Sequence, residues 1–351
     1  MIPLPTLYYF LCYAWNRLPE PAVLLASEAT PFERPLGLLA QVLLHATRRR
    51  LKTGLPRTFQ TQQAELTSLR GRVELAPTLG RGLLGQGRAI CTFDELSTAS
   101  PLHRLLTQTL GVLGRAAALP PALRRELHQV GQRFPAGLHD ATLPPPTATT
   151  FRELRRQRPD SQAAFLVHVC ELVWQTALPE PAANGRRHFT DFRRDETLMA
   201  RIFEQFTRNF FRREQRRYRV FAETIAWQAE AAQAADLALL PTMLTDTTLE
   251  AYDRKIILDT KYYAAALRPR SDRQRLIAPH LYQLYAYLQN QRPAPGQALE
   301  GILLYPAGHG PAATQDVDVR YTLGGHAVRV VTLNLHQPWP GIAADLLRLI
   351  A

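Results

Sequence analysis

One lysine stands out in this chain because lysine is so rare in it. Of 42 basic residues only three are lysines, Lys52, Lys255 and Lys261, and the other 39 (42 minus 3) are arginines. Lys261 follows an apolar run and stands two residues after Asp259. An ammonium is compact and has an adjustable pKa, whereas a guanidinium is planar and effectively always charged. The lysine retained here therefore indicates a site where the size and the chemistry of the cation both matter.

The apolar run that ends in Thr260 predicts a β-strand, in which alternate side chains share a face. Asp259 and Lys261 then project to one side. If a preceding strand pairs with this one through a turn at residues 251–255, Asp246 comes alongside Asp259. Two carboxylates and the backbone carbonyl of Thr260 would supply oxygen ligands, which suit Mg²⁺ or Mn²⁺. Such an ion neutralises charge on a phosphate and activates water, which is the chemistry of phosphodiester hydrolysis.

In this interpretation Lys261 orients the attacking water or stabilises the pentavalent phosphorane. The alternative is a surface ion pair between Asp259 and Lys261 at a strand edge, with Asp246 an ordinary turn aspartate. A further candidate metal ligand is Glu204, which lies on a helix predicted over residues 196–216 and could bind directly or through water. Its alternative is a solvated glutamate paired with the arginine four positions later.

Two residues of a helix predicted over 279–290 complete the candidate set. Gln283 and Tyr287 lie four apart and so share a face. We expect Gln283 to assist catalysis at the attacking water and Tyr287 to contact the DNA backbone. Their alternative is plain helix surface and core. Lys255, in the polar turn before the strand, is a second candidate for contacting DNA.

Composition narrows the class of protein. A chain of 351 residues with 46% hydrophobic residues is long enough for two globular domains. The net charge of +12 and the pI near 10.0 favour a polyanionic partner, nucleic acid before an acidic membrane, although an arginine-rich proteome could also produce them. Three widely spaced cysteines indicate neither disulfides nor zinc, and no apolar run approaches about 20 residues. We expect a soluble cytoplasmic protein.

The Pro- and Gly-containing stretch at residues 178–185 predicts a domain boundary. Residues 1–185 alternate helical patterns with short strands, which predicts a mixed α+β domain. Residues 186–351 read as helix, strands, helix, strand and strand, which predicts an α/β domain with a central mixed sheet flanked by helices. Within it, residues 240–249 are expected to form one strand.

Several motifs resemble those of a known family when taken together and in order. They lie at residues 2–15, 69–73, 91–95, 203–206, 243–246, 257–263, 280–287 and 304–306. The chain is similar to the PD-(D/E)xK nucleases and, among them, to the McrC family of modification-dependent restriction systems. Thr245 replaces the proline of the superfamily name, at a position that does not ligate metal.

The resemblance implies a restriction-endonuclease-like fold for residues 186–351 and a Mg²⁺-dependent DNA endonuclease. It also implies an McrB-like AAA+ GTPase hexamer as partner, on which residues 1–185 dock and whose GTP hydrolysis they stimulate. The partner, not this chain, would recognise modified cytosine in double-stranded DNA. Two alternatives stay open: a non-catalytic bridge that activates an NTPase, and a stand-alone repair nuclease. The intact acidic set argues against the first, and the large amino-terminal region argues against the second.

Overall fold

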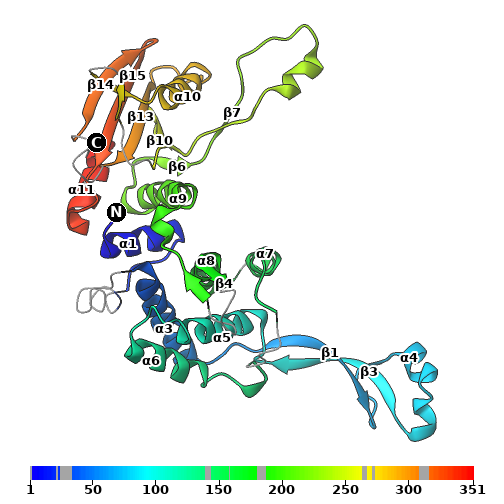
Figure 1. Cartoon of the computed structure of the whole chain (residues 1–351). Helices are drawn as coiled ribbons and strands as arrows, with labels where there is room; N and C mark the ends of the chain where they lie inside the picture. Colours follow the sequence, from blue (N-terminus) through cyan, green and yellow to red (C-terminus); the bar gives the residue numbers. More distant parts are fainter. Residues whose placement is uncertain are drawn as a thin grey trace. The chain divides into compact units, whose positions relative to one another are not determined.

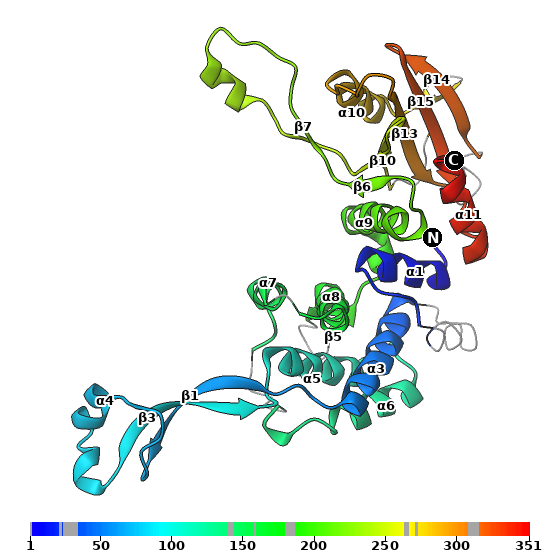
Figure 2. The same cartoon turned by 180° about the vertical axis from the view of Figure 1, so that it is seen from behind.

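The chain folds into two compact units. The computed structural model describes residues 2–20, 23, 34–138, 144–157, 159–179, 187–262, 267–270, 273–307 and 316–351. One unit combines Met1–Leu38 with Thr190–Ala351, and the other is Leu39–Phe189 (Figures 1 and 2). Most of the stretch at 178–185, where we expected a boundary, lies outside the described residues. Among those described, no helix is long and apolar enough to cross a lipid bilayer.

The unit Leu39–Phe189 is a helical body from which a β-hairpin extends (Figure 1). Its helices are α3 (Pro35–Thr53, which begins just before the boundary), α5 (Pro101–Gly114), α6 (Pro121–Gly131), α7 (Ala148–Arg156) and α8 (Ser161–Thr176). The hairpin pairs β1 (Thr58–Leu66) with β3 (Ala89–Ser97), and between them lie β2 (Arg72–Val73), α4 (Leu75–Gly80) and η1 (Leu83–Gln86). The short elements are η2 (Ala136–Leu138), β4 (Ala177–Pro179) and β5 (Arg187–Phe189). The unit is therefore mixed α+β, as the sequence predicts.

The other unit is built on a mixed six-stranded sheet with the order β14-β15-β13-β10-β9-β6. Its strands are β6 (Arg219–Phe221), β9 (Thr247–Glu250), β10 (Arg254–Thr260), β13 (Ala298–Pro306), β14 (Asp318–Leu323) and β15 (His326–Leu333). Its helices are α1 (Leu4–Ala14), α9 (Glu196–Glu214), α10 (Ala278–Gln289) and α11 (Trp339–Leu349). The shorter pieces are η3 (Phe192–Arg194), β7 (Thr224–Ile225), η4 (Ala234–Leu239), β8 (Met243–Leu244), β11 (Leu267–Arg270) and β12 (Arg273–Leu276). The predicted α/β class with a mixed central sheet is confirmed.

Strand β10 lies at the centre of the sheet and is covered on both faces. It runs parallel to β13 and antiparallel to β9, and residues 255–260 are all buried. Ile257 packs against Leu284 and Leu288 of α10. Alternation sends the neighbours of Ile257 to the opposite face, where α9 contacts β10. A strand buried on both faces needs a nearly continuous apolar sequence, so a charged residue within it requires a special reason.

Gly301 of β13 lets α10 approach the sheet closely. A Cβ atom at this position would lie 2.9 Å from Leu288 Cδ1 and 3.0 Å from Leu284 Cδ2. Both leucines are fully buried, so they have little room to move. The glycine therefore fixes the height at which α10 presents its side chains over the end of β10.

The first 38 residues correct our expected division of the chain at 185. They belong with the carboxy-terminal part because α1 packs on α9. The rings of Phe10 and Phe206 stack with centroids 3.9 Å apart, and Asn209 Nδ2 donates to the carbonyls of Tyr13 and Ala14, each at 3.0 Å. These carbonyls lie at the end of α1, where the regular i+4 donors run out, and the Tyr13 carbonyl also accepts from Asn16 N at 3.1 Å. Sequence spacing carries no information on a contact across nearly 200 residues.

The single strand expected over residues 240–249 is also corrected. The structure divides it into β8 and β9. Thr245 N donates to the carbonyl of Glu223 at 2.9 Å, which continues the pairing of β8 with β7; beyond this bond the register shifts by one residue before β9 pairs with β6. Asp246 lies in the break, just before β9, and is therefore free to turn its side chain toward the end of β10.

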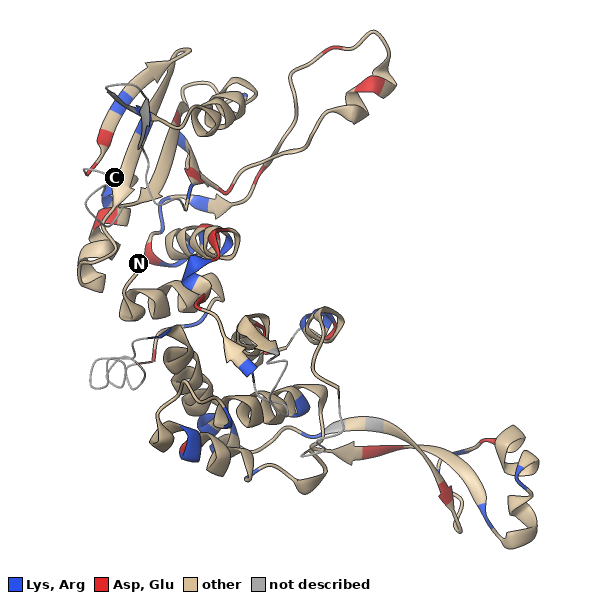
Figure 3. Cartoon of the chain, in the orientation of Figure 1, with Lys and Arg blue, Asp and Glu red and all other residues tan. Residues whose placement is uncertain are grey.

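The segment between β7 and β8 extends away from the sheet (Figure 1). Residues 226–242 contain no lysine or arginine, in a chain with 42 of them (Figure 3). Leu239 is 83% exposed there. The absence of positive charge argues against a nucleic-acid contact along this segment.

The packing of α1 on α9 predicts the effect of one truncation. Phe10→Ala removes a fully buried ring from this contact and should lower the free energy of unfolding by about 3–5 kcal/mol. Leu18→Ala is the matched control, because Leu18 is 60% exposed and should change stability by less than about 0.5 kcal/mol. Urea unfolding followed by circular dichroism measures both. Equal stability of the two variants would contradict the assignment of α1 to this unit.

Candidate active site

Asp259 is a fully buried carboxylate near the end of the central strand. Its exposure is 0%, and neither carboxylate oxygen has a hydrogen-bond partner among the described residues. The cation beside it is Lys261, whose Nζ lies 2.8 Å from Oδ2 as an ion pair. A buried carboxylate without hydrogen bonds is costly, so an arrangement of this kind calls for a functional explanation.

Lys261 is fixed in turn by α10. Its Nζ donates to Gln283 Oε1 at 2.8 Å, and Gln283 Nε2 donates to the Tyr287 hydroxyl at 2.7 Å. That hydroxyl donates to the carbonyl of Leu244, in β8, at 2.9 Å. A continuous chain of contacts thus runs from Asp259 through three side chains to the backbone two residues before Asp246. Each member has its orientation set by the next.

Asp246 meets the same strand end from the neighbouring segment. Its Oδ2 accepts from both the backbone N–H and the hydroxyl of Thr260, each at 2.7 Å. Arg208 NH1 donates to the carbonyl of Asp246 at 2.6 Å and to Glu204 Oε1 at 2.9 Å. Asp246 is therefore held through its backbone by α9 and through its side chain by β10. The expected juxtaposition of Asp246 and Asp259 at one end of the sheet follows from these contacts.

Glu204 lies next to this group, but its carboxylate forms an ion pair with Arg208. This is the i, i+4 pair that the sequence offered as the alternative to metal binding. Burial, and then the negative charge of Asp246, raise the pKa of Glu204 above its ordinary value. Its carboxylate is thus within electrostatic reach of Asp246, and Arg208 holds it in place. Whether it also contacts a metal, directly or through water, remains a proposal.

The electrostatics of the site set Asp259 apart. Burial first, and the charge of Asp246 second, raise the pKa of Asp259 to about 7. Lys261 opposes this shift without overcoming it. Although burial disfavours its ammonium, the adjacent Asp259 carboxylate raises the pKa of Lys261. Lys261 therefore stays protonated at neutral pH and acts as a cation rather than as a base.

The carboxylates fit a divalent cation. The Asp259 carboxylate, whose Oδ2 pairs with Lys261 and whose Oδ1 has no partner among the described residues, and the remaining Oδ1 of Asp246 are hard ligands of the kind that Mg²⁺ and Mn²⁺ take. A cation between them would offset the repulsion that raises the pKa of Asp259. No group of three His, Cys, Asp or Glu side chains converges as a metal cage within the described part of the chain. Any ion held here would therefore need the Thr260 carbonyl and water as additional ligands.

Two expected DNA contacts are corrected by the structure. Lys255 is only 6% exposed, and its Nζ donates to Glu223 Oε1 and Gln291 Oε1, both at 2.8 Å. Tyr287 is 5% exposed, and its hydroxyl takes part in the contacts to Gln283 and Leu244. Neither side chain is available to a phosphate backbone. Lys255 links strand β10 to Glu223 and Gln291, and Tyr287 positions Gln283.

Sequence reasoning missed the contacts that hold the site from behind. The bond from Arg208 to the Asp246 carbonyl and the two donors of Thr260 to Asp246 were not anticipated. Arg208 gave one usable signal, its place four residues after Glu204. Nothing local marks Leu244 as the acceptor for Tyr287, because a backbone carbonyl has no sequence signature.

With the geometry established, the chain can be compared with known proteins. Residues 6–306 match the family described as McrBC 5-methylcytosine restriction system component. The chain belongs to this McrBC family. It is 29% identical over 348 residues to the type IV methyl-directed restriction enzyme EcoKMcrBC of Escherichia coli K12, an alignment covering 99% of this chain and 97% of that protein.

Solved structures of McrBC complexes also resemble this member of the McrBC family. A half-complex from the tetradecameric assembly of Thermococcus gammatolerans McrB AAA+ hexamers with bound McrC matches with a TM-score of 0.56 and 12% identity. That match covers 99% of this chain and 76% of the other. The T. gammatolerans McrBC complex matches with a TM-score of 0.40 over 62% of this chain and 60% of the other. At 12% identity the first likeness concerns the fold.

The raised pKa of Asp259 predicts an unusual dependence of stability on pH. Its pKa is about 7 when folded and about 3.9 in an unfolded chain. The folded state therefore holds the proton more tightly, and the stabilisation present below pH 4 is lost as the pH rises toward 7. The Asp259→Asn variant has no carboxyl group to titrate at this position, so it does not lose this stabilisation as the pH rises. In chelator, the stability of the variant relative to the parent should increase by roughly 3 kcal/mol between pH 4 and pH 8.

Urea unfolding at several pH values measures this difference. Asp318→Asn serves as a control of opposite sign, because hydrogen bonding to Arg329 lowers the pKa of Asp318. That carboxylate stabilises the fold above its unfolded pKa, and its stabilisation is lost as the pH falls. A pH trend shared by both variants would contradict the assignment for Asp259.

Proposed function

We propose that this chain is the Mg²⁺-dependent DNA endonuclease subunit of an McrBC-type restriction complex. We further propose that it stimulates GTP hydrolysis by an McrB-like AAA+ hexamer. The observation that carries the nuclease assignment is the buried Asp259, which lacks hydrogen-bond partners and lies beside Asp246 and Lys261. Membership of the McrBC family and the full-length likeness to EcoKMcrBC support the same conclusion.

The metal site follows from the ligands present. Asp246, Asp259 and the Thr260 carbonyl would hold Mg²⁺, with Mn²⁺ as a substitute, and Glu204 would act through water. When bound, the ion lowers the pKa of a water molecule and neutralises charge on the phosphate. Thr260 and Arg208 hold Asp246 so that its second oxygen stays available. This arrangement agrees with the restriction-endonuclease-like PD-(D/E)xK fold, which we propose for residues 190–351 together with α1.

Lys261 would stabilise the charge that develops on the scissile phosphate. Because its pKa is raised, the side chain remains an ammonium and donates its protons only as hydrogen bonds. Gln283 is exposed and holds Lys261 through its amide oxygen. It can also orient the attacking water when DNA displaces part of that contact. The Tyr287 hydroxyl accepts a hydrogen bond from Gln283 Nε2 and thereby fixes the rotamer of Gln283.

The partner and the substrate follow from family membership and charge. The solved structure with the TM-score of 0.56 contains McrB AAA+ hexamers with bound McrC, and we propose an equivalent partner here. Unit Leu39–Phe189 is the candidate docking part, because the described side chains of the nuclease site all lie in the other unit. Double-stranded DNA as the substrate is in keeping with the net charge of +12. Recognition of modified cytosine would belong to the partner.

Removing the ammonium should separate the two activities. Lys261→Gln should abolish Mg²⁺-dependent cleavage of a methylated plasmid, because no cation then faces the phosphate, while the rate of partner GTP hydrolysis stays unchanged. Lys52→Gln is the matched control, since Lys52 is exposed and lies in the other unit. Gel assays of nicking and phosphate release measure the two activities. Parallel loss of both in a folded variant would contradict the proposed division of labour.

Metal binding can be tested without activity. Mg²⁺ or Mn²⁺ should raise the melting temperature of the chain alone, because the ion binds the folded state and relieves repulsion between two carboxylates. Asp259→Asn should remove that rise. Asp253→Asn, an exposed acid paired only with Arg217 among the described residues, should retain it. An undiminished rise in Asp259→Asn would place the metal elsewhere.

Tyr287→Phe tests the positioning role of the hydroxyl. Without it Gln283 loses its acceptor and Leu244 its donor, so kcat should fall about tenfold or more with KM little changed. Tyr282→Phe on the same helix is the control, because Tyr282 is 67% exposed. The Mg²⁺-induced rise in melting temperature should persist in both variants. Equal kcat in the two variants would remove Tyr287 from the site.

A further inference from the structure

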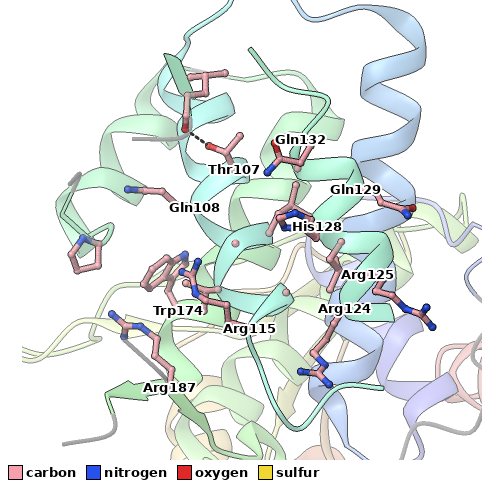
Figure 4. Close-up of a pocket in the computed structure, with 18 of the residues that line it drawn as sticks. Thr107, Gln108, Arg115, Arg124, Arg125, His128, Gln129, Gln132, Trp174 and Arg187 are labelled. Atoms are coloured by element: carbon pink, nitrogen blue, oxygen red, sulfur yellow. Dashed lines mark hydrogen bonds between the residues drawn. The ribbon is translucent and has the colours of Figure 1, made fainter. Parts of the chain in front are cut away.

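A second site candidate lies in the unit Leu39–Phe189. A cavity of about 950 Å³ is bounded by α5, α6 and the chain around Trp174 and Arg187 (Figure 4). Its size is at the upper end of the range for small-molecule pockets, about 300–1,000 Å³. It contains none of the residues of the nuclease site. Its function must therefore be sought in its own chemistry.

Positive charge without compensation is the main property of this cavity. Four arginines line it, Arg115, Arg124, Arg125 and Arg187, together with His128. No Asp or Glu occurs among its described lining residues, and none of the four guanidiniums forms an ion pair in the described part of the chain. The one acidic residue of α6, Glu126, is paired with Arg48 of α3 at 2.7 Å. Four like charges around one hollow with no acidic neighbour among its described lining residues favour an anion there.

Arg124 supplies a second, independent sign of a missing partner. Its Nε is buried and has no hydrogen-bond acceptor among the described residues. Pro121, at the start of α6, also lines the cavity, and no side chain caps the first amides of that helix. A buried donor and an uncapped helix start both favour an acceptor with negative charge.

Another wall of the cavity is aromatic, because Trp174 of α8 lines it. Trp174 Nε1 donates to Thr109 Oγ1 at 2.9 Å, which fixes the indole ring. The guanidinium of Arg187 lies 4.8 Å from the ring centroid and is anchored by a bond to the Ala177 carbonyl at 3.0 Å. Figure 4 shows Arg115 beside Trp174, with Arg124 and Arg125 coming from α6. Gln108, Gln129 and Gln132 add amides that can both donate and accept.

We propose that this cavity binds a nucleoside di- or triphosphate. The phosphate oxygens would accept hydrogen bonds from the guanidiniums, whose forked N–H donors match phosphate oxygens in pairs. The base would lie toward Trp174 and the glutamine amides. A single carboxylate would neutralise only one of four charges, so an isolated acidic side chain of a partner protein is a poorer match. A DNA duplex presents its charges along an extended surface, whereas this site is a hollow bounded by α5, α6 and the chain around Trp174.

Calorimetric titration of the purified full-length chain tests the proposal. ATP, GTP, pyrophosphate and inorganic phosphate are titrated in chelator, where the proposed nuclease site holds no metal. We expect one saturable nucleotide site, weaker binding of pyrophosphate and still weaker binding of phosphate. The double variant Arg115→Gln/Arg125→Gln, both exposed positions, should weaken nucleotide binding about tenfold or more. Arg152→Gln, an exposed arginine on α7 outside the cavity, should bind as the parent does.

Fluorescence locates the bound base. The chain has four tryptophans, and nucleotide should quench emission in the parent but not in Trp174→Phe. Equal affinity in the double variant and in Arg152→Gln would overturn the site. Equal affinity for pyrophosphate and nucleotides would overturn recognition of the base. Saturable binding of duplex DNA or of a glutamate-rich peptide, lost in the double variant while nucleotides fail to bind, would overturn the ligand class. All these outcomes are independent of nuclease activity.

Discussion

A carboxylate buried at the end of a central strand is the constraint on which this molecule is organised. Asp259 has no exposed surface and no hydrogen-bond partner in the described structure. Such a group destabilises the fold when it is charged, because the surrounding packing removes the water that would solvate the charge. Three separate elements converge on it: Lys261, which directly follows the strand and offsets its charge, the break before β9, which brings the like charge of Asp246, and α10, which holds Lys261 through Gln283. The sheet order places them together, and Gly301 sets the height of α10.

The same convergence explains how much of the site could be predicted. Alternation along one strand places Asp259 and Lys261 on one face, and a turn of five residues brings Asp246 back beside them. Both arguments use only local geometry, and both agree with the contacts seen here. The i, i+4 spacing likewise anticipated that Gln283 and Tyr287 touch, and they do.

The failures have a common physical cause, which is distance along the chain. Lys255 was expected to face DNA, yet Glu223 and Gln291, each more than 30 positions away, hold it inside. The expected placement of residues 1–38 differs from the structure because Phe10 stacks on Phe206, whereas the unit boundary at 189–190 lies close to the expected one at 185. The expected strand over 240–249 is divided because the register shifts by one residue between the pairing of β8 with β7 and that of β9 with β6, and no side-chain pattern reveals this shift. Long-range partners decide burial, and one sequence does not contain them.

The place of α1 has a consequence for biosynthesis. Helix α1 leaves the ribosome well before the helix on which it packs, because Asn209, which donates to its last turn, follows 196 residues after Tyr13. At about 5–20 residues per second, the apolar face of α1 waits on the order of ten seconds or more for its permanent neighbour. The inserted unit Leu39–Phe189 can fold during that interval, whereas the other unit cannot be complete until residues 190–351 have been made. The unit that holds Asp246 and Asp259 is therefore completed after the inserted unit, and the exposed helix is a natural client for a chaperone in the meantime.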